Sequence, residues 1–342
     1  MIRLTDTTLT HMEPLQHFDF AKVIRFCGLL CKIGVDFVEM PAELYETLRF
    51  KTNGSFGSWA DAGDGSNVYD EDPASVHIPL LLHIDVDGQM DSFPEIPRFV
   101  CRSCEDVTDA RLIHELQLND IREINRLHNS NRLSRVRLKG LDDILLKDYV
   151  QAFSQIQSYL GKEYEYCPQD SFGLATASAV EWISQGGSRL VTSFGGLGNC
   201  APTEEVLMAL RINSRHHPNH DMTVMPQLRH LFEEMTGTHF SPRKPILGSQ
   251  IFQVEAGIHA DGIDKDPYTY EPYGPESVGT ARALVVGKHS GTKAIEIKMA
   301  QMEIPYHPTD LMPILRKVQE ESIRIGRSLT DDEFVRVVRS MK

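Results

Sequence analysis

The sequence predicts an α/β protein that consists of a (β/α)8-like barrel followed by a small helical subdomain. From residue 1 to about 235, short apolar and β-branched runs alternate with helix-like stretches, which is the pattern of β/α units around a parallel sheet. Glycine follows several of the helix-like stretches, for example at Gly34 and Gly161, where a helix C-terminus favours a left-handed residue. Repeats of helix, glycine and short strand favour a closed barrel over an open sheet.

Seven segments of the first 235 residues have the composition of buried strands, and at least three stretches between them have that of helices. The strand candidates are residues 2–7, 37–40, 78–84, 98–101, 136–139, 164–167 and 190–194, and the helix candidates are 20–34, 146–161 and 175–187. Residues 52–75 are rich in Gly, Ser and Asp, which indicates a long surface loop. Between residues 102 and 134 only one weak strand fits. The count therefore leaves open an incomplete or distorted barrel.

The composition of the chain changes after about residue 236. Two amphipathic helices are expected near 292–302 and 308–325, and a last helix follows Thr330, an N-cap residue with two acids behind it. We therefore divide the chain into a barrel domain, residues 1–235, and a linker or lid subdomain with dimerisation helices, residues 236–342.

The composition excludes several classes of partner. A formal net charge of −13 argues against nucleic acid or an anionic membrane surface as the main partner. No run reaches the roughly eighteen apolar residues of a membrane span, and the first residues lack the basic-then-apolar pattern of a secretion signal. We therefore expect a cytoplasmic protein with small-molecule or protein partners, whose six cysteines are free thiols rather than a disulfide framework.

Two groups of residues carry candidate chemistry. His11, Cys167 and Asp170 fall at the C-terminal ends of predicted strands, where barrels place their active sites, and the trio would suit a soft divalent metal such as zinc. His259 lies in a glycine-flanked turn that precedes Tyr270 and two further tyrosines. The residues alone leave two interpretations of this turn open, a general base with hydroxyl partners or a surface loop.

The second half of the chain resembles the linker subdomain of the homocitrate synthase and isopropylmalate synthase family. The stretch that carries the resemblance is "GSQIFQVEAGIHADGIDKDPYTYEPYGPESVGTARALVVGKHSG", residues 248–291. The family has E-S-G-I-H-x-D-G, then N-P-x-T-Y-E-P, then V-G and G-K-H-S-G. Earlier in the chain, "DTTL", "FVEMPA", "DSFGLATASAV" and "GGLG" are similar to further motifs of the same family.

The resemblance implies a Claisen-type condensation of acetyl-CoA with a 2-oxo acid. In the family, a divalent ion held by one carboxylate and two histidines polarises the ketone, and an arginine stabilises the oxyanion. A histidine and a tyrosine of the neighbouring subunit's linker subdomain complete the site, and the histidine assists proton removal from the acetyl group.

The barrel half of this chain departs from the family pattern. Thr10 stands at the position of the arginine, and His11 at that of the metal-binding carboxylate. Cys167 and Gln169 stand at the two metal-binding histidines, while Asp170 is kept. A hard, oxygen-preferring cation would not be held by such a set. We therefore expect no metal in this chain.

The linker half keeps the pattern. His259 stands at the catalytic histidine of the family and Tyr270 at its tyrosine. The flanking positions that support them also match, and they are Glu255, Asp261, Lys288 and His289. One half of a shared site is thus altered and the other half retained.

This asymmetry predicts one subunit of a two-component homocitrate synthase. The chain would place His259 and Tyr270 in the barrel of a homologous catalytic subunit, which supplies the divalent metal, and acetyl-CoA and 2-oxoglutarate would bind through the complex. It most resembles the omega subunit, the C-terminal portion of the split homocitrate synthase of some nitrogen-fixing anaerobes. The chain is not expected to be active alone.

Three alternatives remain open at this stage. In the first, the chain is a pseudoenzyme that scaffolds or regulates a related synthase. In the second, its assembly has isopropylmalate or citramalate synthase activity. The third alternative is a lone lyase or hydrolase that uses His11, Cys167 and Asp170 with zinc.

Overall fold

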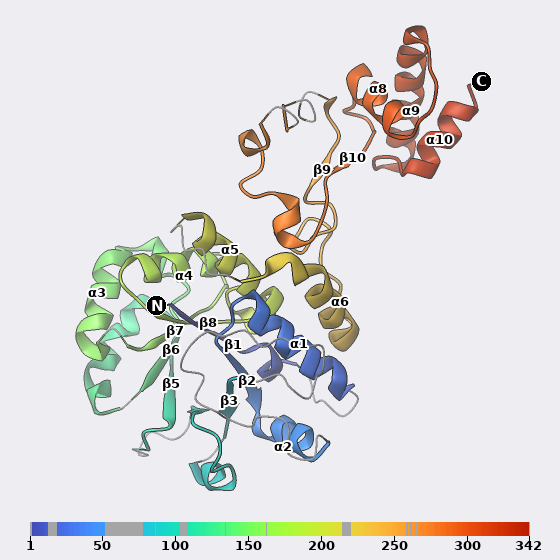
Figure 1. The fold of residues 1–342 in the computed structure, drawn as a ribbon. Coiled ribbons are helices and arrows are strands. Elements are labelled where there is room, and N and C mark those ends of the chain that lie inside the picture. Colours follow the sequence, from blue (N-terminus) through green and yellow to red (C-terminus); the bar gives the residue numbers. More distant parts are fainter. Residues whose placement is uncertain are drawn as a thin grey trace. The chain divides into compact units, whose positions relative to one another are not determined.

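The computed structural model describes residues 2–12, 19–51, 78–85, 87–102, 109–133, 135–161, 163–213, 220–257, 259, 262–263 and 266–341. The chain divides into two compact units, Met1–Phe240 and Ser241–Lys342, and each is described by itself (Figure 1). The whole loop expected at residues 52–75, together with Asp261, lies outside the described residues. No helix in the described ranges is long and apolar enough to cross a membrane.

The first unit is a closed barrel of eight parallel strands, in which each strand pairs with the next and β8 pairs with β1. The strands are β1 (Arg3–Asp6), β2 (Phe37–Pro41), β3 (Leu80–His83), β4 (Phe99–Cys101), β5 (Leu112–Leu118), β6 (Val136–Gly140), β7 (Glu165–Pro168) and β8 (Arg189–Thr192). The predicted fold class is confirmed. The barrel is complete because β5 lies in the stretch where the sequence offers only a weak strand. Its sequence, LIHELQL, carries the buried polar residues His114 and Glu115, so it has neither a continuous apolar run nor a clean alternation.

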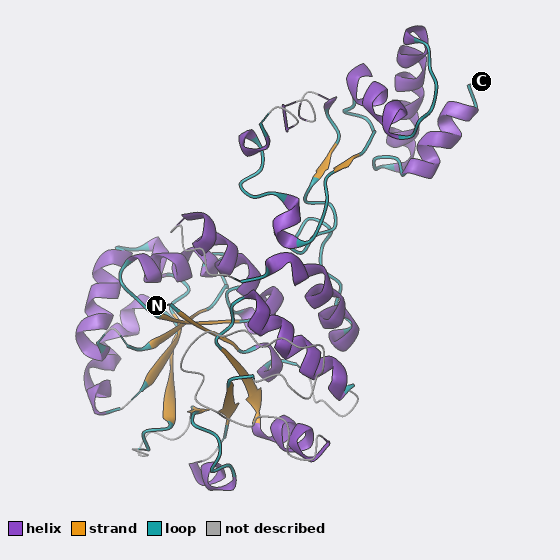
Figure 2. Ribbon diagram, in the orientation of Figure 1, coloured by secondary structure: helices purple, strands orange, loops and turns teal. Residues whose placement is uncertain are grey.

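Helices surround the strands (Figure 2). The α-helices are α1 (Phe20–Ile33), α2 (Ala42–Lys51), α3 (Tyr149–Leu160), α4 (Ala175–Ser184), α5 (Thr203–Asn213) and α6 (Met225–Thr236). Short 3₁₀ segments occupy other connections, namely η1 (Thr8–Thr10), η3 (Asp87–Ser92), η4 (Ile121–Arg132), η5 (Ile144–Leu146), η6 (Phe194–Asn199) and η7 (Met222–Val224). Helix α1 begins at the N-cap Asp19, which accepts a hydrogen bond from the Ala21 amide, and ends at Gly34 in a left-handed conformation.

The interior of the barrel has an apolar layer and a charged layer. Alternate residues of each strand point inward, and Leu81, Val100 and Ile113 form a small apolar cluster there. Next to this cluster along the strands lies Arg137 of β6, which is 1% exposed. Its guanidinium contacts carboxylates from three other strands, which are Glu39 of β2 at 2.5 Å, Glu165 of β7 at 2.9 Å and Glu115 of β5 at 3.6 Å.

These ion pairs keep the buried groups charged. Burial alone would raise the pKa of Glu39, but the Arg137 guanidinium and His83 lower it to about 2. Burial likewise disfavours a charged Arg137, yet the three carboxylates raise its pKa well above the usual value. Four strands are therefore tied to one buried cation.

The second unit contains a two-stranded parallel sheet, β9 (Gln253–Val254) with β10 (Ala283–Leu284), and the 3₁₀ turns η8 (Pro267–Thr269) and η9 (Pro275–Val278). Its remaining elements are α8 (Thr292–Gln301), η10 (Pro308–Asp310), α9 (Leu311–Ile325) and α10 (Asp331–Arg339). The three α-helices share an apolar core that includes Ile295, Val318 and Phe334. The predicted C-terminal helices are confirmed, and Thr330 caps α10 in a capping box with Glu333.

Replacing Arg137 by methionine is expected to lower the free energy of unfolding by about 3–5 kcal/mol at neutral pH, because Glu39 and Glu165 would stay buried without their cation. The folded-state pKa of Glu39 lies below its unfolded value, so the wild type loses this stabilisation as the pH falls from about 5 to about 2. The gap between variant and wild type should narrow over the same range. Urea unfolding followed by tryptophan fluorescence measures it, since both tryptophans lie in the first unit.

The matched control is Arg122→Met. Arg122 also pairs with a carboxylate, Asp120, but its side chain is 86% exposed, and exposed ion pairs contribute little. A loss at Arg137 no larger than that at Arg122 would contradict the assignment of Arg137 as the organising charge.

Candidate functional site

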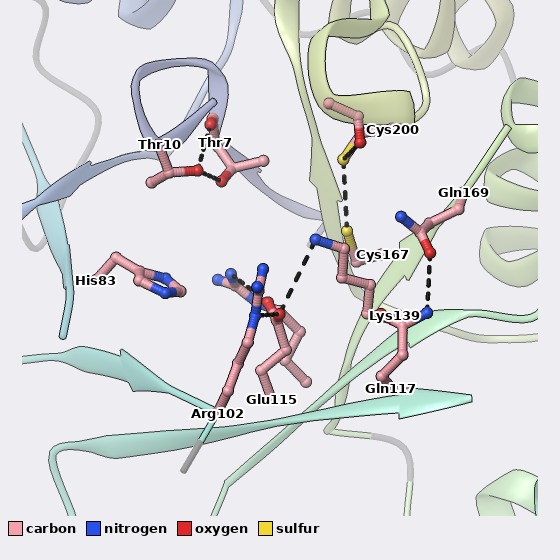
Figure 3. A network of polar contacts seen from close by, with 12 residues as sticks. Thr7, Thr10, His83, Arg102, Glu115, Gln117, Lys139, Cys167, Gln169 and Cys200 are labelled. Carbon is pink, nitrogen blue, oxygen red and sulfur yellow. Dashed lines mark hydrogen bonds and ion pairs between the residues drawn. The ribbon is translucent and has the colours of Figure 1, made fainter. Parts of the chain in front are cut away.

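Two places in the structure carry the predicted functional residues: the mouth of the barrel and a cavity in the second unit. At the mouth, polar side chains from several strand ends converge (Figure 3). Gln117 donates from its amide nitrogen to Gln169 at 2.9 Å. Arg102 pairs with Glu115 at 2.6 Å, and the Lys139 ammonium lies 3.9 Å from the same carboxylate.

The loop of β1 is fixed by its Asp-Thr-Thr sequence. Asp6 is fully buried and accepts hydrogen bonds from the Thr8 amide at 2.9 Å and from the Thr203 hydroxyl at 2.6 Å. The Thr8 hydroxyl in turn accepts a hydrogen bond from the Phe194 amide at 2.7 Å. The segment that carries Thr10 and His11 is thereby attached to η6, the loop after β8.

The four residues at the altered positions are engaged with protein neighbours. Thr10 donates to the Thr7 carbonyl at 2.8 Å, and Gln169 accepts from Gln117. The His11 Nε2 lies 3.7 Å from the Cys200 Sγ, which is 4.0 Å from the Cys167 Sγ.

The residues at the mouth do not fit the divalent ion that the family resemblance implies. The donors at the altered positions are a hydroxyl, an imidazole, a thiol and an amide, whereas such an ion prefers oxygen ligands with negative charge. Asp170, the predicted third member of a zinc trio, accepts instead from the Ala175 amide at 2.8 Å, at the start of α4. Within the described ranges no three His, Cys, Asp or Glu side chains are arranged to hold a metal.

Cys200 is a residue of the mouth that the predicted site residues do not include, although residues 196–200 follow a predicted strand. It follows η6, where Gly195, Gly196 and Gly198 have φ values of 68°, 79° and 69°, and it bridges to Gln169 beside β7. A Cβ on Gly198 would lie 2.4 Å from the His11 ring. The glycine therefore permits His11 to lie against the loop, close to Cys200. The one sequence signal for it is the glycine cluster after a strand end.

The thiols of the chain differ in state. The free cysteines of the described part are Cys27, Cys31, Cys167 and Cys200. Cys101, by contrast, is disulfide-bonded, which corrects the expectation of a free thiol there. The hydrogen bond with Cys167 and the proximity of His11 lower the pKa of Cys200. The hydrogen bond with Cys200 and burial raise the pKa of Cys167.

The second unit contains a cavity of about 410 Å³, and most of the predicted site residues of this unit line it. Its walls are largely apolar, from Ile251, Phe252 and Val254 among others, and its polar groups include Glu255, His259, Tyr270 and His289. Apolar walls with a few convergent polar groups are typical of ligand-binding sites.

His259 and Tyr270 lie side by side at this cavity. Their ring centroids are 5.0 Å apart with an interplanar angle of 47°. Both side chains are exposed, Tyr270 to 47%. A Cβ on Gly262 would lie 2.7 Å from the Tyr270 ring, so the glycine of the E-A-G-I-H-A-D-G motif provides room for that ring.

The supporting residues have structural contacts. Glu255 accepts a hydrogen bond from the His289 amide at 2.7 Å and another from the Ser328 hydroxyl at 3.4 Å. The Lys288 amide donates to the Ser322 hydroxyl of α9 at 3.1 Å. The G-K-H-S-G loop therefore connects Glu255, which follows β9, to helix α9. The side chains of Lys288 and His289 remain exposed. The catalytic roles of His259 and Tyr270 stay predictions.

Comparisons with known proteins agree with this geometry. Residues 246–324 match the family model described as "Homocitrate synthase post-HMGL domain-like". The barrel resembles hydroxymethylglutaryl-CoA lyase of Bacillus subtilis, with a TM-score of 0.52 at 13% identity over 73% of this chain and 97% of that one. It also resembles the lyase of Pseudomonas aeruginosa, with a TM-score of 0.50 at 13% identity over 69% and 93%. These two structures support the barrel fold alone.

Several curated proteins have a higher sequence identity to this chain than these two structures have. It is 28% identical over 236 residues to the homocitrate synthase omega subunit of Clostridium pasteurianum, which covers 68% of this chain and 67% of that protein. It is 37% identical to homocitrate synthase 1 of Nostoc sp., over 60% and 56%. It is also 26% identical to 2-isopropylmalate synthase 2 of Caldanaerobacter subterraneus subsp. tengcongensis, over 98% and 94%. The chain is thus similar to the homocitrate and isopropylmalate synthases, and the predicted resemblance is confirmed. The match spans about half the length of homocitrate synthase 1 and of two further curated proteins, both named homocitrate synthase AksA.

The buried Asp6 generates a test of the mouth's scaffold. Burial raises the pKa of Asp6 to about 6, above its value of 3.8 in the unfolded chain. The folded state therefore binds a proton more tightly, and the contribution of Asp6 to stability increases as the pH falls from about 7 to about 4. A shift of this size corresponds to about 3 kcal/mol.

Asp6→Asn keeps the shape and removes the charge. The stability of the variant relative to wild type should be about 2–3 kcal/mol more favourable at pH 8 than at pH 4, as measured by urea unfolding at both values. A difference that is the same at the two pH values would refute the raised pKa.

Proposed function

We propose that this chain is the subunit of a two-component homocitrate synthase that supplies His259 and Tyr270 to a homologous, metal-bearing catalytic subunit. The assembly condenses acetyl-CoA with 2-oxoglutarate. The single observation that carries the proposal is the contrast between the two sites. Donors at the barrel mouth are bound to one another, whereas His259 and Tyr270 are exposed together at a cavity.

The barrel mouth supports an inactive role for this chain's own barrel. His11, Cys167 and Gln169 offer no carboxylate at the altered positions, and each contacts a protein neighbour. A subunit of this kind requires its metal, and the polarisation of the ketone, from another chain.

The cavity supports a contribution to proton transfer. A general base must reach the proton it removes, and the exposed imidazole of His259 is free to reach a substrate that another subunit binds. Its role would be to take a proton from the methyl carbon of the acetyl group, which then attacks the ketone carbon of the 2-oxo acid. Tyr270, 5.0 Å away between ring centroids, would orient the imidazole or donate a hydrogen bond as charge develops.

A relative's printed name supports the division into subunits. The Clostridium pasteurianum protein is called the omega subunit of a homocitrate synthase, and this chain is similar to it over about two thirds of both lengths. The match to 2-isopropylmalate synthase 2 over 98% of this chain favours one second candidate, an assembly that uses a shorter 2-oxo acid. Parallel assays with 2-oxoglutarate, 2-oxoisovalerate and pyruvate separate these candidates.

We expect the purified chain to be inactive alone and active with its catalytic partner, because the metal site resides in that partner. In the assembly, His259→Ala should lower the acetyl-CoA consumption rate by about 10² or more, the usual effect of losing a general acid or base. Tyr270→Phe should lower it by about tenfold, which corresponds to one hydrogen bond. The release of free CoA thiol measures both.

His230→Ala is the matched control, since His230 is 71% exposed on α6 of the first unit. It should leave the rate unchanged. Metal-dependent turnover by the chain alone would refute the division of labour. An active assembly in which His259→Ala has no effect would instead favour a scaffolding role for this chain.

A further inference from the structure

We propose that Cys167 and Cys200 form an oxidative modification site, a thiol pair that a hydroperoxide converts into an intrachain disulfide. The site lies at the mouth of the barrel and is independent of the proposed synthase function. It rests on the position of three side chains, the two thiols and the imidazole of His11.

The two sulfur atoms are already in contact. Cys167 of β7 and Cys200 after η6 have Sγ atoms 4.0 Å apart, 33 residues apart along the chain (Figure 3). Together with Val191 of β8 they form a small buried cluster. A disulfide bond requires about 2.05 Å between the sulfur atoms, so they must approach by about 2 Å. The glycine-rich loop that carries Cys200 is the element that would move.

The surroundings distinguish the two thiols. The His11 Nε2 is 3.7 Å from the Cys200 Sγ, and the positive charge of Lys139 also favours the thiolate form of Cys200. Cys167 is held as the thiol, with its pKa raised by its partner and by burial. Because the thiolate is the reactive form of cysteine, Cys200 is the attacking group and Cys167 the resolving one.

The chemistry balances with one hydroperoxide. The Cys200 thiolate attacks one oxygen of hydrogen peroxide and the O–O bond breaks, which gives a sulfenic acid and hydroxide. Hydroxide takes up the proton that the Cys200 thiol had released and becomes water. The Cys167 sulfur then attacks the Cys200 sulfur and displaces a second hydroxide, which takes the Cys167 proton and also becomes water. Two thiols are oxidised to one disulfide, and the peroxide is reduced to two waters.

The chain offers a matched pair of thiols that lacks this arrangement. Cys27 and Cys31 lie one turn apart on α1. Burial raises the pKa of both, and the carboxylates that act on them, Asp6 and Asp36, raise it further. They should therefore remain reduced under conditions that oxidise Cys200.

The test is oxidation of the full chain with a small excess of hydrogen peroxide, followed by non-reducing peptide mapping and mass spectrometry. The expected product is a cross-link between the peptides of Cys167 and Cys200 with a loss of two hydrogen atoms. Cys101 is already disulfide-bonded and serves as an internal reference. Cys27→Ala should leave the reaction unchanged, whereas His11→Gln should slow it by about tenfold or more, because less of Cys200 is thiolate.

A second variant keeps the proposal falsifiable. Cys167→Ala removes the resolving thiol, so a sulfenic acid at Cys200 should accumulate and be trapped by dimedone. Oxidation that occurs first at Cys27 or Cys31, or over-oxidation of Cys200 in the wild type with Cys167 left free, would overturn the proposal. So would one equivalent of zinc in the purified chain that disappears in Cys200→Ala, because the two thiols would then be metal ligands.

Discussion

The interior of the barrel depends on one buried charge, the guanidinium of Arg137. It contacts carboxylates from β2, β5 and β7, so one side chain connects strands that are not neighbours in the sheet. Burying a charge is costly unless it is paired and hydrogen-bonded. The buried carboxylates and the guanidinium therefore stabilise one another in the charged form. Lys139 and Arg102 supply further positive charge at Glu115. The layer above, the mouth, is built on this fixed base.

The polar side chains of the mouth also pair with one another, but through weaker interactions than these buried ion pairs. Amide pairs with amide, as in Gln117 and Gln169, and thiol with thiol and imidazole, as in Cys167, Cys200 and His11. Each of these five side chains has a protein neighbour, whereas an open metal site leaves a coordination position for solvent or substrate. His259 and Tyr270 of the second unit, by contrast, lie exposed at a cavity. There the backbone of the G-K-H-S-G loop makes the structural hydrogen bonds.

The sequence predicts what depends on local pattern and misses what depends on distant neighbours. Strands with apolar runs, such as β3, are found readily, but β5 is obscured because His114 and Glu115 are buried only once the barrel closes. The Arg137 cluster has no sequence signal, since its carboxylates come from strands far apart in the chain. Cys200 lies outside any periodic segment. The proximity of His259 and Tyr270 follows from the family resemblance, because the irregular chain between them has no repeat from which a distance could be derived.

The donor set at the altered positions and the proposed thiol pair are physically related. A carboxylate and two histidines suit a divalent ion because they offer hard or borderline donors around an open position. Once thiols stand at such a position, polarisable sulfur atoms contact one another and an imidazole that favours the thiolate. The same strand ends can thus support redox chemistry in place of metal binding, because the donor atoms that they carry differ.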